Sequence, residues 1–262
     1  MHVVVCIKQV PDTADVKINP ETNTLVRDGV KSIINPFDMY AIEEGIRIKE
    51  ATEGRVTVIT MGPPQAEEAL KEAVSMGVDD AILISDRAFA GSDTYATSYT
   101  LAAAIDKIGD YDIIICGKQA SDGDTAQVGP GIATHLDLPQ VTYVKKIVSL
   151  NKETVVVERM TEKGYDVVEV KVPCLFTVVK EINEPRVPSL RGKMKAKRFQ
   201  SAKWSAQDLD ADPEKIGLKG SPTQVVKIFI PRRDIESETI TGETPNEIAE
   251  KLVEKLKSVL KG

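Results

Sequence analysis

The sequence predicts an α/β protein: a Rossmann-like, mostly parallel sheet with helices on both faces, an antiparallel β extension and a C-terminal arm ending in a helix. Three observations predict this fold. Apolar, β-branched runs of strand length alternate with helix-length segments through the first half of the chain, which is the order that builds a parallel sheet. From residue 140 onward such runs follow one another with only turns between them. The final residues carry an apolar stripe at helical spacing.

The first strand is expected at residues 3–7, a continuous apolar run that is typical of a strand buried on both faces. Two short β-favouring patches, at residues 16–18 and 24–26, predict a hairpin or excursion after it. The first helix should begin at Asn35-Pro36 and end near Gly54, because asparagine can cap free amides and proline presets φ at the first helical position.

The next segments continue the alternation. Strands are predicted at residues 56–61, 81–84 and 113–116, and helices at residues 62–76, 93–108 and from near Thr125 to about Leu136. Further strands, at residues 141–150, 154–159, 167–172 and 175–179, should form either an antiparallel extension of the same sheet or a small attached layer.

Periodicity weakens beyond Asn183, so the chain divides into an α/β domain of residues 1–183 and an arm of residues 184–262. Within the arm only residues 225–230 predict a strand. A helix should start at a capping box formed by Thr244 and Glu247, with an apolar stripe of Ile248, Leu252 and Leu256. A long arm without its own core usually lies on the parent domain or on another chain.

Composition excludes several classes of function. The chain has 34 Lys+Arg against 40 Asp+Glu, a net charge of −6, which argues against a nucleic-acid binder. Cys6, Cys116 and Cys174 are widely spaced in apolar runs, so reduced, buried thiols are expected rather than disulfides or a metal site. No apolar run is long enough to span a membrane and no export signal is present, which predicts a cytoplasmic protein.

The loop after the fourth strand, GKQASDGDTAQVGPG at residues 117–131, is the main candidate site. In an open α/β sheet ligands bind at the carboxyl ends of strands, and amides at a helix N-terminus attract phosphates. The loop is neither a P-loop nor an intact GxGxxG motif. From the residues alone, a nucleotide loop and a simple polar connection therefore both stay open. Asp122 and Asp124 are more typical of a turn than of a metal or acid–base pair.

A basic run covers residues 191–203 of this acidic chain. It is typical of a solvated helix face, but it could also form an electrostatic docking patch with Leu190 as an apolar anchor. Both interpretations stay open from the residues alone.

Several separated segments then match one family in the same order: Cys6-Ile7-Lys8, DGVKSIINPFD at residues 28–38, Met61-Gly62-Pro63, the loop at residues 117–128, and NEPR at residues 183–186 followed by Leu190. Along essentially its whole length the chain resembles the beta subunit of electron transfer flavoproteins. One departure is Lys163, at a position that the family usually fills with acidic residues or glycine.

The resemblance implies a pocket for an adenosine nucleotide. Its wall would come from Cys6, Asn35, Pro36, Phe37, Asp38 and Met61. The phosphates would lie along Gly117, Lys118, Gln119, Ala120, Ser121, Asp122, Gly123, Asp124, Thr125, Ala126, Gln127 and Val128.

Members of the family that only shuttle electrons hold AMP in this pocket, whereas electron-bifurcating members hold a second FAD. The form SDGDTAQVGPG, followed by PQVTY at residues 139–143, resembles the bifurcating type. Small Gly123, Thr125 and Ala126 would leave room for a diphosphate. FAD is therefore the expected cofactor, and AMP in the same pocket is the alternative.

The resemblance also implies partners. The chain would pair with a larger alpha subunit, dock a flavin-dependent dehydrogenase of the acyl-CoA type or similar through Leu190, and receive electrons from NADH for that dehydrogenase and for ferredoxin or flavodoxin. Residues 184–262 would hold the recognition loop and an arm on the alpha subunit. No residue need be catalytic, because the redox chemistry belongs to the flavin. A stand-alone adenine-nucleotide-binding enzyme is the weaker alternative.

Overall fold

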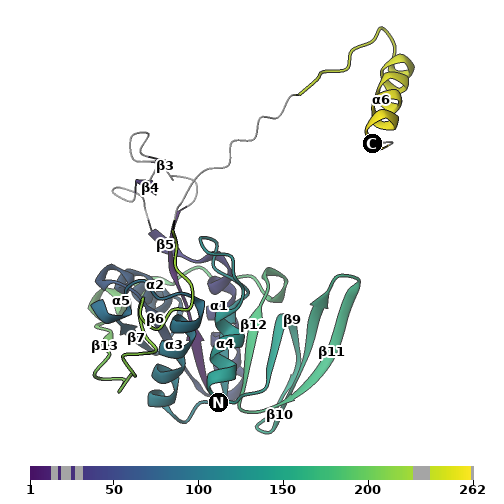
Figure 1. Ribbon diagram of the computed structural model, residues 1–262. Coiled ribbons are helices and arrows are strands. Elements are labelled where there is room, and N and C mark those ends of the chain that lie inside the picture. Colours follow the sequence, from purple (N-terminus) through teal and green to yellow (C-terminus); the bar gives the residue numbers. More distant parts are fainter. Residues whose placement is uncertain (13–16, 19–24, 27–31, 227–236, 261–262) are drawn as a thin grey trace. The chain divides into compact units, whose positions relative to one another are not determined.

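The computed structural model describes residues 1–12, 17–18, 25–26, 32–226 and 237–260 (Figure 1). The chain divides into two compact units, residues 1–226 and residues 227–262. Within the described residues, the first unit contains a nine-stranded sheet of order β11-β10-β9-β12-β8-β1-β6-β7-β13. The predicted α/β fold with a mostly parallel sheet is confirmed.

The centre of the sheet is β1 (His2–Cys6), which pairs in parallel with β6 (Arg55–Met61) on one side and with β8 (Ile113–Gly117) on the other. Alternate residues of β1 are buried in two separate core clusters, one on each face of the sheet, as the continuous apolar run predicts. Further parallel strands are β7 (Asp80–Ile84) and β13 (Ala202–Trp204) beyond β6, and β12 (Cys174–Val178) beyond β8.

Helices cover both faces of this sheet (Figure 1). One core cluster lies beneath α1 (Pro36–Thr52) and α2 (Glu67–Met76), and the other beneath α3 (Thr94–Ile108) and α4 (Val128–His135). Gly77 ends α2 with φ +131°, and Asp93 caps α3 by accepting hydrogen bonds from Tyr95 N and Ala96 N. The 3₁₀ turns of the described residues are η2 (Pro64–Ala66), η3 (Arg87–Phe89) and η4 (Lys180–Ile182).

The antiparallel extension belongs to the same sheet, which decides between the two predicted alternatives. The long strand β9 (Gln140–Leu150) pairs in parallel with β12. The hairpin of β10 (Thr154–Thr161) and β11 (Gly164–Lys171) then adds to β9 in antiparallel fashion.

Two short antiparallel pairs follow β1. They are β2 (Gln9–Pro11) with β5 (Ser32–Ile34) and β3 (Lys17–Ile18) with β4 (Leu25–Val26). The second pair agrees with the predicted hairpin as far as the described residues extend, since Val16 and Thr24 lie outside them.

Three predictions need correction. Helix α4 begins at Val128 rather than near Thr125, because Asp124 and Ala126 have φ of +54° and +55°, values that a right-handed helix excludes. The strand β13 lies where the sequence predicted no strand, whereas the helix α5 (Leu190–Arg198) agrees with the helix face that is one interpretation of the basic run. Of the strand expected at residues 225–230, only the first two residues are described, and they are not in a strand.

The second unit contains α6 (Pro245–Leu260), which starts as the sequence predicts. Thr244 Oγ1 accepts a hydrogen bond from Glu247 N at 3.3 Å, whereas the Glu247 carboxylate bonds to Glu243 N at 2.9 Å rather than to Thr244. Among the described residues, no helix is long and apolar enough to cross a membrane.

Candidate functional site

The order of the strands creates a topological switch point beside the end of β1, and the region outside the carboxyl ends of β1 and β8 is called the crevice below. The chain runs outward from β1 to β6 and β7 and then returns to the other side of β1 as β8. Ligands of open α/β sheets bind at such switch points, outside the carboxyl ends of the strands. Cys6 and Cys116 are register partners at these ends, and both are free, buried thiols. A hydrogen bond between them and burial raise the pKa of the Cys116 thiol, so it stays protonated near pH 7.

Asn35 joins the segments that meet at this crevice. Its backbone N–H donates to Lys8 O at 2.8 Å, and its side-chain amide donates to Gln119 O at 2.8 Å and to Asp38 Oδ1 at 3.0 Å. Its Oδ1 accepts from Ser121 N at 3.0 Å. Asn35 precedes α1 as predicted, but its side chain makes no capping hydrogen bond to that helix. The predicted capping role is wrong, because the side chain instead bridges Asp38 of α1 and the loop after β8.

Asp38 is the second buried polar group of the crevice. Its Oδ2 accepts from Lys8 N at 2.7 Å. Burial raises the pKa of Asp38 to about 7, although hydrogen bonds from Asn35, Lys8 and Gly117 act in the opposite direction. A Cβ atom added at Gly117 would lie 2.3 Å from Asp38 Oδ1. Gly117 is therefore needed for the close approach of α1 to β8.

The loop after β8 is held by contacts to its own residues and to β1. The Asp124 N–H donates to Ala120 O at 2.9 Å, and the Gln119 side chain bonds to the Asp124 carboxylate. The Lys8 ammonium pairs with Asp122 Oδ1 at 2.6 Å. The loop then leads into α4, whose N-cap Gln127 makes no side-chain hydrogen bond to the helix. Uncapped amides at a helix start are suited to bind an anion.

The residues predicted for the site fall into three groups. The first group meets at the carboxyl ends of β1 and β8 through the contacts above and consists of Cys6, Asn35, Asp38, Gly117, Gln119, Ser121 and Asp122. Met61 packs with Cys6 in the same core cluster. Phe37 contacts Lys118, and Pro36 is exposed at the first position of α1. The third group forms the outer part of the loop, before Val128 begins α4, and consists of Gly123, Asp124, Thr125, Ala126 and Gln127.

Two residues were not predicted for the site. Lys8 belongs to a segment that carried the family resemblance, so a signal for it was present. Tyr143 lies in the apolar pattern of β9, which gives no sign that its ring meets Lys118.

Ala126 is strained, because its φ of +55° places Cβ in a region that costs an L-residue about 1 kcal/mol or more. We expect Ala126→Gly to raise the free energy of unfolding by about 0.5 kcal/mol, after the greater freedom of unfolded glycine is subtracted. Chemical denaturation measures this change. The matched control Ala120→Gly, at a position without positive φ, should lower stability instead; the same sign for both variants would contradict the assignment of strain.

Leu190 does not join these residues. It is the first residue of α5, which packs on α2, and its side chain is 77% exposed. One helical turn later Met194 is 54% exposed. Together with Arg191, Lys195 and Arg198, they line a shallow hollow. Lys195 Nζ donates to Val78 O at 2.9 Å and fixes α5 against the end of α2.

The NEPR segment at residues 183–186, which precedes α5, is fixed to α1 by ion pairs and hydrogen bonds. Arg186 pairs with Glu43 at 2.8 Å and with Glu50 at 2.6 Å. Burial pushes the pKa of Glu43 upward, but hydrogen bonds from Arg186 and Arg47 outweigh it and lower that pKa. Asn183 Nδ2 donates to Tyr40 O at 3.0 Å. The segment that leads into the exposed basic helix α5 is therefore fixed to α1.

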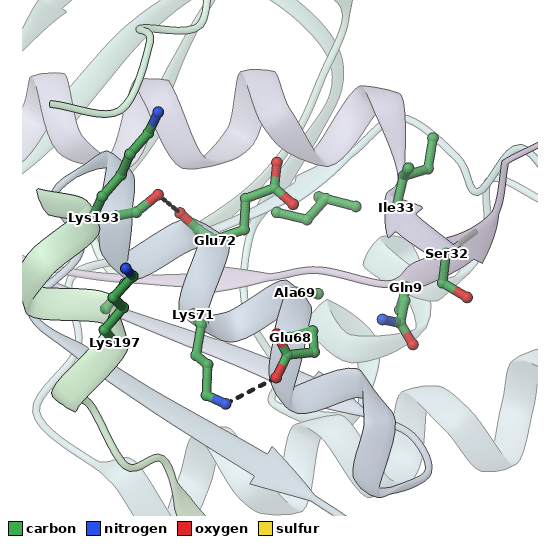
Figure 2. Close-up of a pocket in the computed structure, with 12 residues that line it drawn as sticks. Gln9, Ser32, Ile33, Glu68, Ala69, Lys71, Glu72, Lys193 and Lys197 are labelled. Atoms are coloured by element: carbon green, nitrogen blue, oxygen red, sulfur yellow. Dashed lines mark hydrogen bonds and ion pairs between the residues drawn. The ribbon is translucent and has the colours of Figure 1, made fainter. Parts of the chain in front are cut away.

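A separate hollow of about 410 Å³ lies between α2, α5 and the β2–β5 pair. Figure 2 shows Lys193 and Lys197 of α5 on one side of it and Ser32 and Ile33 of β5 on the other. Glu68 and Lys71 pair across 2.8 Å at its edge. Among the described residues, its lining has no glycine and none of residues 35–38 or 117–128. The carboxyl ends of β1 and β8, where backbone amides are available, therefore remain the candidate site.

Comparison with known proteins gives consistent matches. Residues 22–209 match the family model described as electron transfer flavoprotein domain. The chain is 54% identical to the electron transfer flavoprotein subunit beta of Thermoanaerobacterium thermosaccharolyticum, over 98% of both chains. It is 51% identical to the caffeyl-CoA reductase-Etf complex subunit CarD of Acetobacterium woodii, again over 98% of both chains. Identity to the electron transfer flavoprotein subunit beta of Megasphaera elsdenii is 48%, with 98% of both chains covered.

Proposed function

The chain belongs to the electron transfer flavoprotein family as a beta subunit, and from this premise we propose that it binds FAD at the carboxyl ends of β1 and β8. We further propose that it pairs with an alpha subunit and takes part in electron bifurcation from NADH to ferredoxin or flavodoxin and to a partner flavin dehydrogenase. The observation that carries the proposal is the loop at residues 117–128, which is fixed by hydrogen bonds to Asn35 and leads to the uncapped start of α4.

The residues present are suited to a dinucleotide. A Cβ atom added at Gly123 would meet nothing within 4 Å, so the outer loop is open to a bulky ligand. Asn35 and Asp38 are 1% and 5% exposed. Asn35 bonds to Gln119 and Ser121 of the loop and to the Asp38 carboxylate. Small side chains at Gly123, Thr125 and Ala126 allow the backbone to approach phosphates closely. These features support FAD over a connection without a ligand.

The protein's part in such chemistry is binding and orientation. Bound FAD would supply hydride and single-electron transfer. Asn35 would keep the amides of residues 119 and 121 in place, and the start of α4 would donate its free N–H groups to phosphate oxygens. The buried Asp38 would hold α1 against β1 and β8, so that the wall of the pocket does not move when the ligand binds.

Nucleotide extraction tests this proposal. The chain is co-purified with its alpha partner, and FAD and AMP are quantified for each heterodimer by chromatography and absorbance. About two FAD and no AMP would support a bifurcating subunit. About one FAD with one AMP would mean a simple electron shuttle, and a heterodimer without nucleotide in the beta subunit would contradict the site itself.

Residues 184–262 are proposed to serve partner binding. Leu190 and Met194 offer exposed apolar side chains inside a basic helix, which suits a partner with an apolar pocket and an acidic rim. The apolar stripe of α6, with Ile248, Leu252 and Leu256 exposed in its own unit, is suited to cover an apolar surface of the alpha subunit. The caffeyl-CoA reductase complex named for one relative is consistent with a dehydrogenase partner.

We expect Leu190→Ala to weaken electron delivery to the partner dehydrogenase by roughly tenfold, the usual loss for a central apolar anchor. Nucleotide content should not change, because Leu190 lies outside the crevice. Stopped-flow reduction of the dehydrogenase at varied concentration measures the effect. Leu218→Ala is the matched control, since it removes the same atoms from a leucine that is 55% exposed outside α5. Equal delivery by both variants and the wild type would remove the docking role of Leu190.

A further inference from the structure

Asp38 is a buried carboxylate that has hydrogen-bond donors but no cation of its own. The residue is 5% exposed, and its two carboxylate oxygens accept from Lys8 N at 2.7 Å and from Asn35 Nδ2 at 3.0 Å. The Lys8 ammonium pairs instead with Asp122 Oδ1 at 2.6 Å. Throughout the described ranges, no ion pair is made to the Asp38 carboxylate. Its negative charge is therefore stabilised by neutral N–H groups alone.

The elements packed against Asp38 carry other titratable or charged side chains, but none of them compensates it. They are Cys6 on β1, Cys116 on β8, Lys118 directly after β8, and Lys180 and Glu181 on η4, which packs on α1. The two thiols are buried and the two side chains of η4 are exposed. The Lys118 ammonium lies over the ring of Phe37, 5.7 Å from its centre. Within the part of the chain that the structure describes, none of these side chains bonds to the Asp38 carboxylate.

Burial and hydrogen bonding act on this carboxylate in opposite directions. Burial favours the neutral acid, whereas hydrogen bonds from N–H donors favour the carboxylate. Burial has the larger effect and raises the pKa of Asp38 from its ordinary value of 3.8 to about 7. A small further change in the surroundings of Asp38 is therefore enough to change its charge near neutral pH.

Asp38 is directly connected to the loop at residues 117–128. A Cβ atom added at Gly117 would overlap Asp38 Oδ1, so no side chain separates the carboxylate from the start of the loop. Asn35, which donates to Asp38 Oδ1, also donates to Gln119 O and accepts from Ser121 N. An anion held along this loop would therefore act on Asp38 through buried groups rather than through bulk water.

A bound nucleotide would change the surroundings of Asp38 in two ways, and both favour the neutral acid. The phosphates add negative charge, which disfavours a second negative charge nearby. The body of the ligand covers the crevice and removes water, which disfavours the charged form again. The proton affinity of Asp38 should rise when the crevice fills. By reciprocity, nucleotide affinity should fall as pH rises through the pKa of Asp38 in the empty site.

We propose that Asp38 is a proton-accepting positioning residue of the nucleotide site: it takes up a proton from solvent when an anionic dinucleotide enters the crevice and returns it when the dinucleotide leaves. A neutral acid, rather than a buried charge, then stands between α1 and β8 beside the ligand. This inference rests on the proposed function, because it requires a nucleotide at the carboxyl ends of β1 and β8. It goes further by making cofactor affinity depend on pH through one carboxyl group.

The test measures FAD affinity against pH. FAD is a suitable probe because its phosphates are diesters, whereas a phosphate monoester itself titrates near pH 6. The beta site of the heterodimer is emptied while the alpha subunit keeps its flavin, and FAD is titrated by calorimetry between about pH 6 and about pH 9. The dissociation constant should rise about tenfold over this range, the effect of a shift of about one pKa unit on binding. Buffers of different ionisation enthalpy should reveal uptake of about half a proton per FAD near pH 7.5.

Two variants separate proton uptake from structural support. Asp38→Asn cannot titrate, so its FAD affinity, whatever its level, should be independent of pH and should show no proton uptake. Glu44→Gln is the matched control. Glu44 is another buried carboxylate of α1 whose pKa is raised by burial, but it bonds to Asn183 at 2.9 Å rather than to the loop. Glu44→Gln should keep the pH dependence of the wild type.

Infrared difference spectra of the wild type give a second measurement that needs no variant of Asp38. Addition of FAD near pH 7.5 should produce a carboxylic acid C=O band that shifts when the aspartates are labelled with carbon-13. This measurement holds even if Asp38→Asn fails to fold, because both hydrogen bonds to Asp38 come from N–H donors and an amide nitrogen cannot accept one of them.

The outcomes are distinguishable. Affinity that falls with pH in the wild type and in Glu44→Gln but not in Asp38→Asn, together with the new C=O band, supports the inference. Constant affinity of the wild type, or the same pH dependence in Asp38→Asn, would overturn it while leaving the nucleotide site intact. Failure of the wild type to bind FAD at every pH would overturn the proposed function and this inference together.

Discussion

Replacement of Gly117 by alanine is expected to abolish nucleotide binding and to lower the free energy of unfolding by about 3 kcal/mol, the upper range for an overpacked site. The added Cβ would lie 2.3 Å from Asp38 Oδ1 and 2.7 Å from the Phe37 carbonyl carbon. Asp38 is buried and fixed by hydrogen bonds from Lys8 and Asn35. Neither neighbour can move away cheaply, so α1 must separate from β8 and the crevice must open.

Denaturation midpoints and nucleotide content measure the two effects of Gly117→Ala. Gly123→Ala is the matched control in the same loop, because its Cβ would meet nothing within 4 Å. Gly123→Ala should change stability by less than about 0.5 kcal/mol. If Gly117→Ala kept both its stability and its nucleotide, the close packing of α1 against β8 would not be required for binding.

Replacement of Asn35 by alanine is expected to reduce nucleotide affinity roughly a hundredfold. The change removes the partners of Gln119 O and Ser121 N and one donor to Asp38. The two loop hydrogen bonds are partly buried, so each loss costs up to about 1.5 kcal/mol, and two such losses correspond to a factor of about one hundred. The loop amides would then have to be ordered by the ligand itself, at the expense of affinity.

Asn183→Ala provides the control for Asn35→Ala. Asn183 also donates two side-chain hydrogen bonds, to Tyr40 O and to Glu44 Oε2, at 3.0 and 2.9 Å, but it contacts no residue of the loop at residues 117–128. Both variants should lose stability, whereas only Asn35→Ala should lose affinity in a nucleotide titration. Comparable affinities of the two variants would show that Asn35 contributes only to folding.

The sequence predicted the parts of the fold that depend on local pattern. β1 could be identified because a strand buried on both faces must be apolar throughout. The candidate residues before α1 and after β8 could be expected to lie close together because the carboxyl ends of parallel strands meet at one edge, which requires only the order of the elements. Asn35 was correctly placed before α1, since asparagine followed by proline is typical of that position.

The features that the sequence did not predict depend on contacts distant along the chain. β13 exists because residues 202–204 pair with Ile82, Leu83 and Ile84 of β7, and no local pattern reveals that pairing. A helix face was one interpretation of the basic run, but the packing of α5 was not predicted: Ala196 lies in the core cluster and Lys195 bonds to Val78 O beyond the end of α2. The late start of α4 follows from positive φ at Asp124 and Ala126, and Tyr143 also has a positive φ, within a strand. An alternating pattern cannot show either.

Hydrogen exchange measured by mass spectrometry on the heterodimer, with the beta site emptied and then reloaded with FAD, tests most directly whether a nucleotide occupies the carboxyl ends of β1 and β8. We expect exchange to slow in peptides that cover residues 35–38 and 117–128. Peptides that line the separate hollow between α2 and α5, residues 68–75 and 193–197, should not change. Slower exchange confined to those peptides, with no change at residues 117–128, would contradict the assignment of the site.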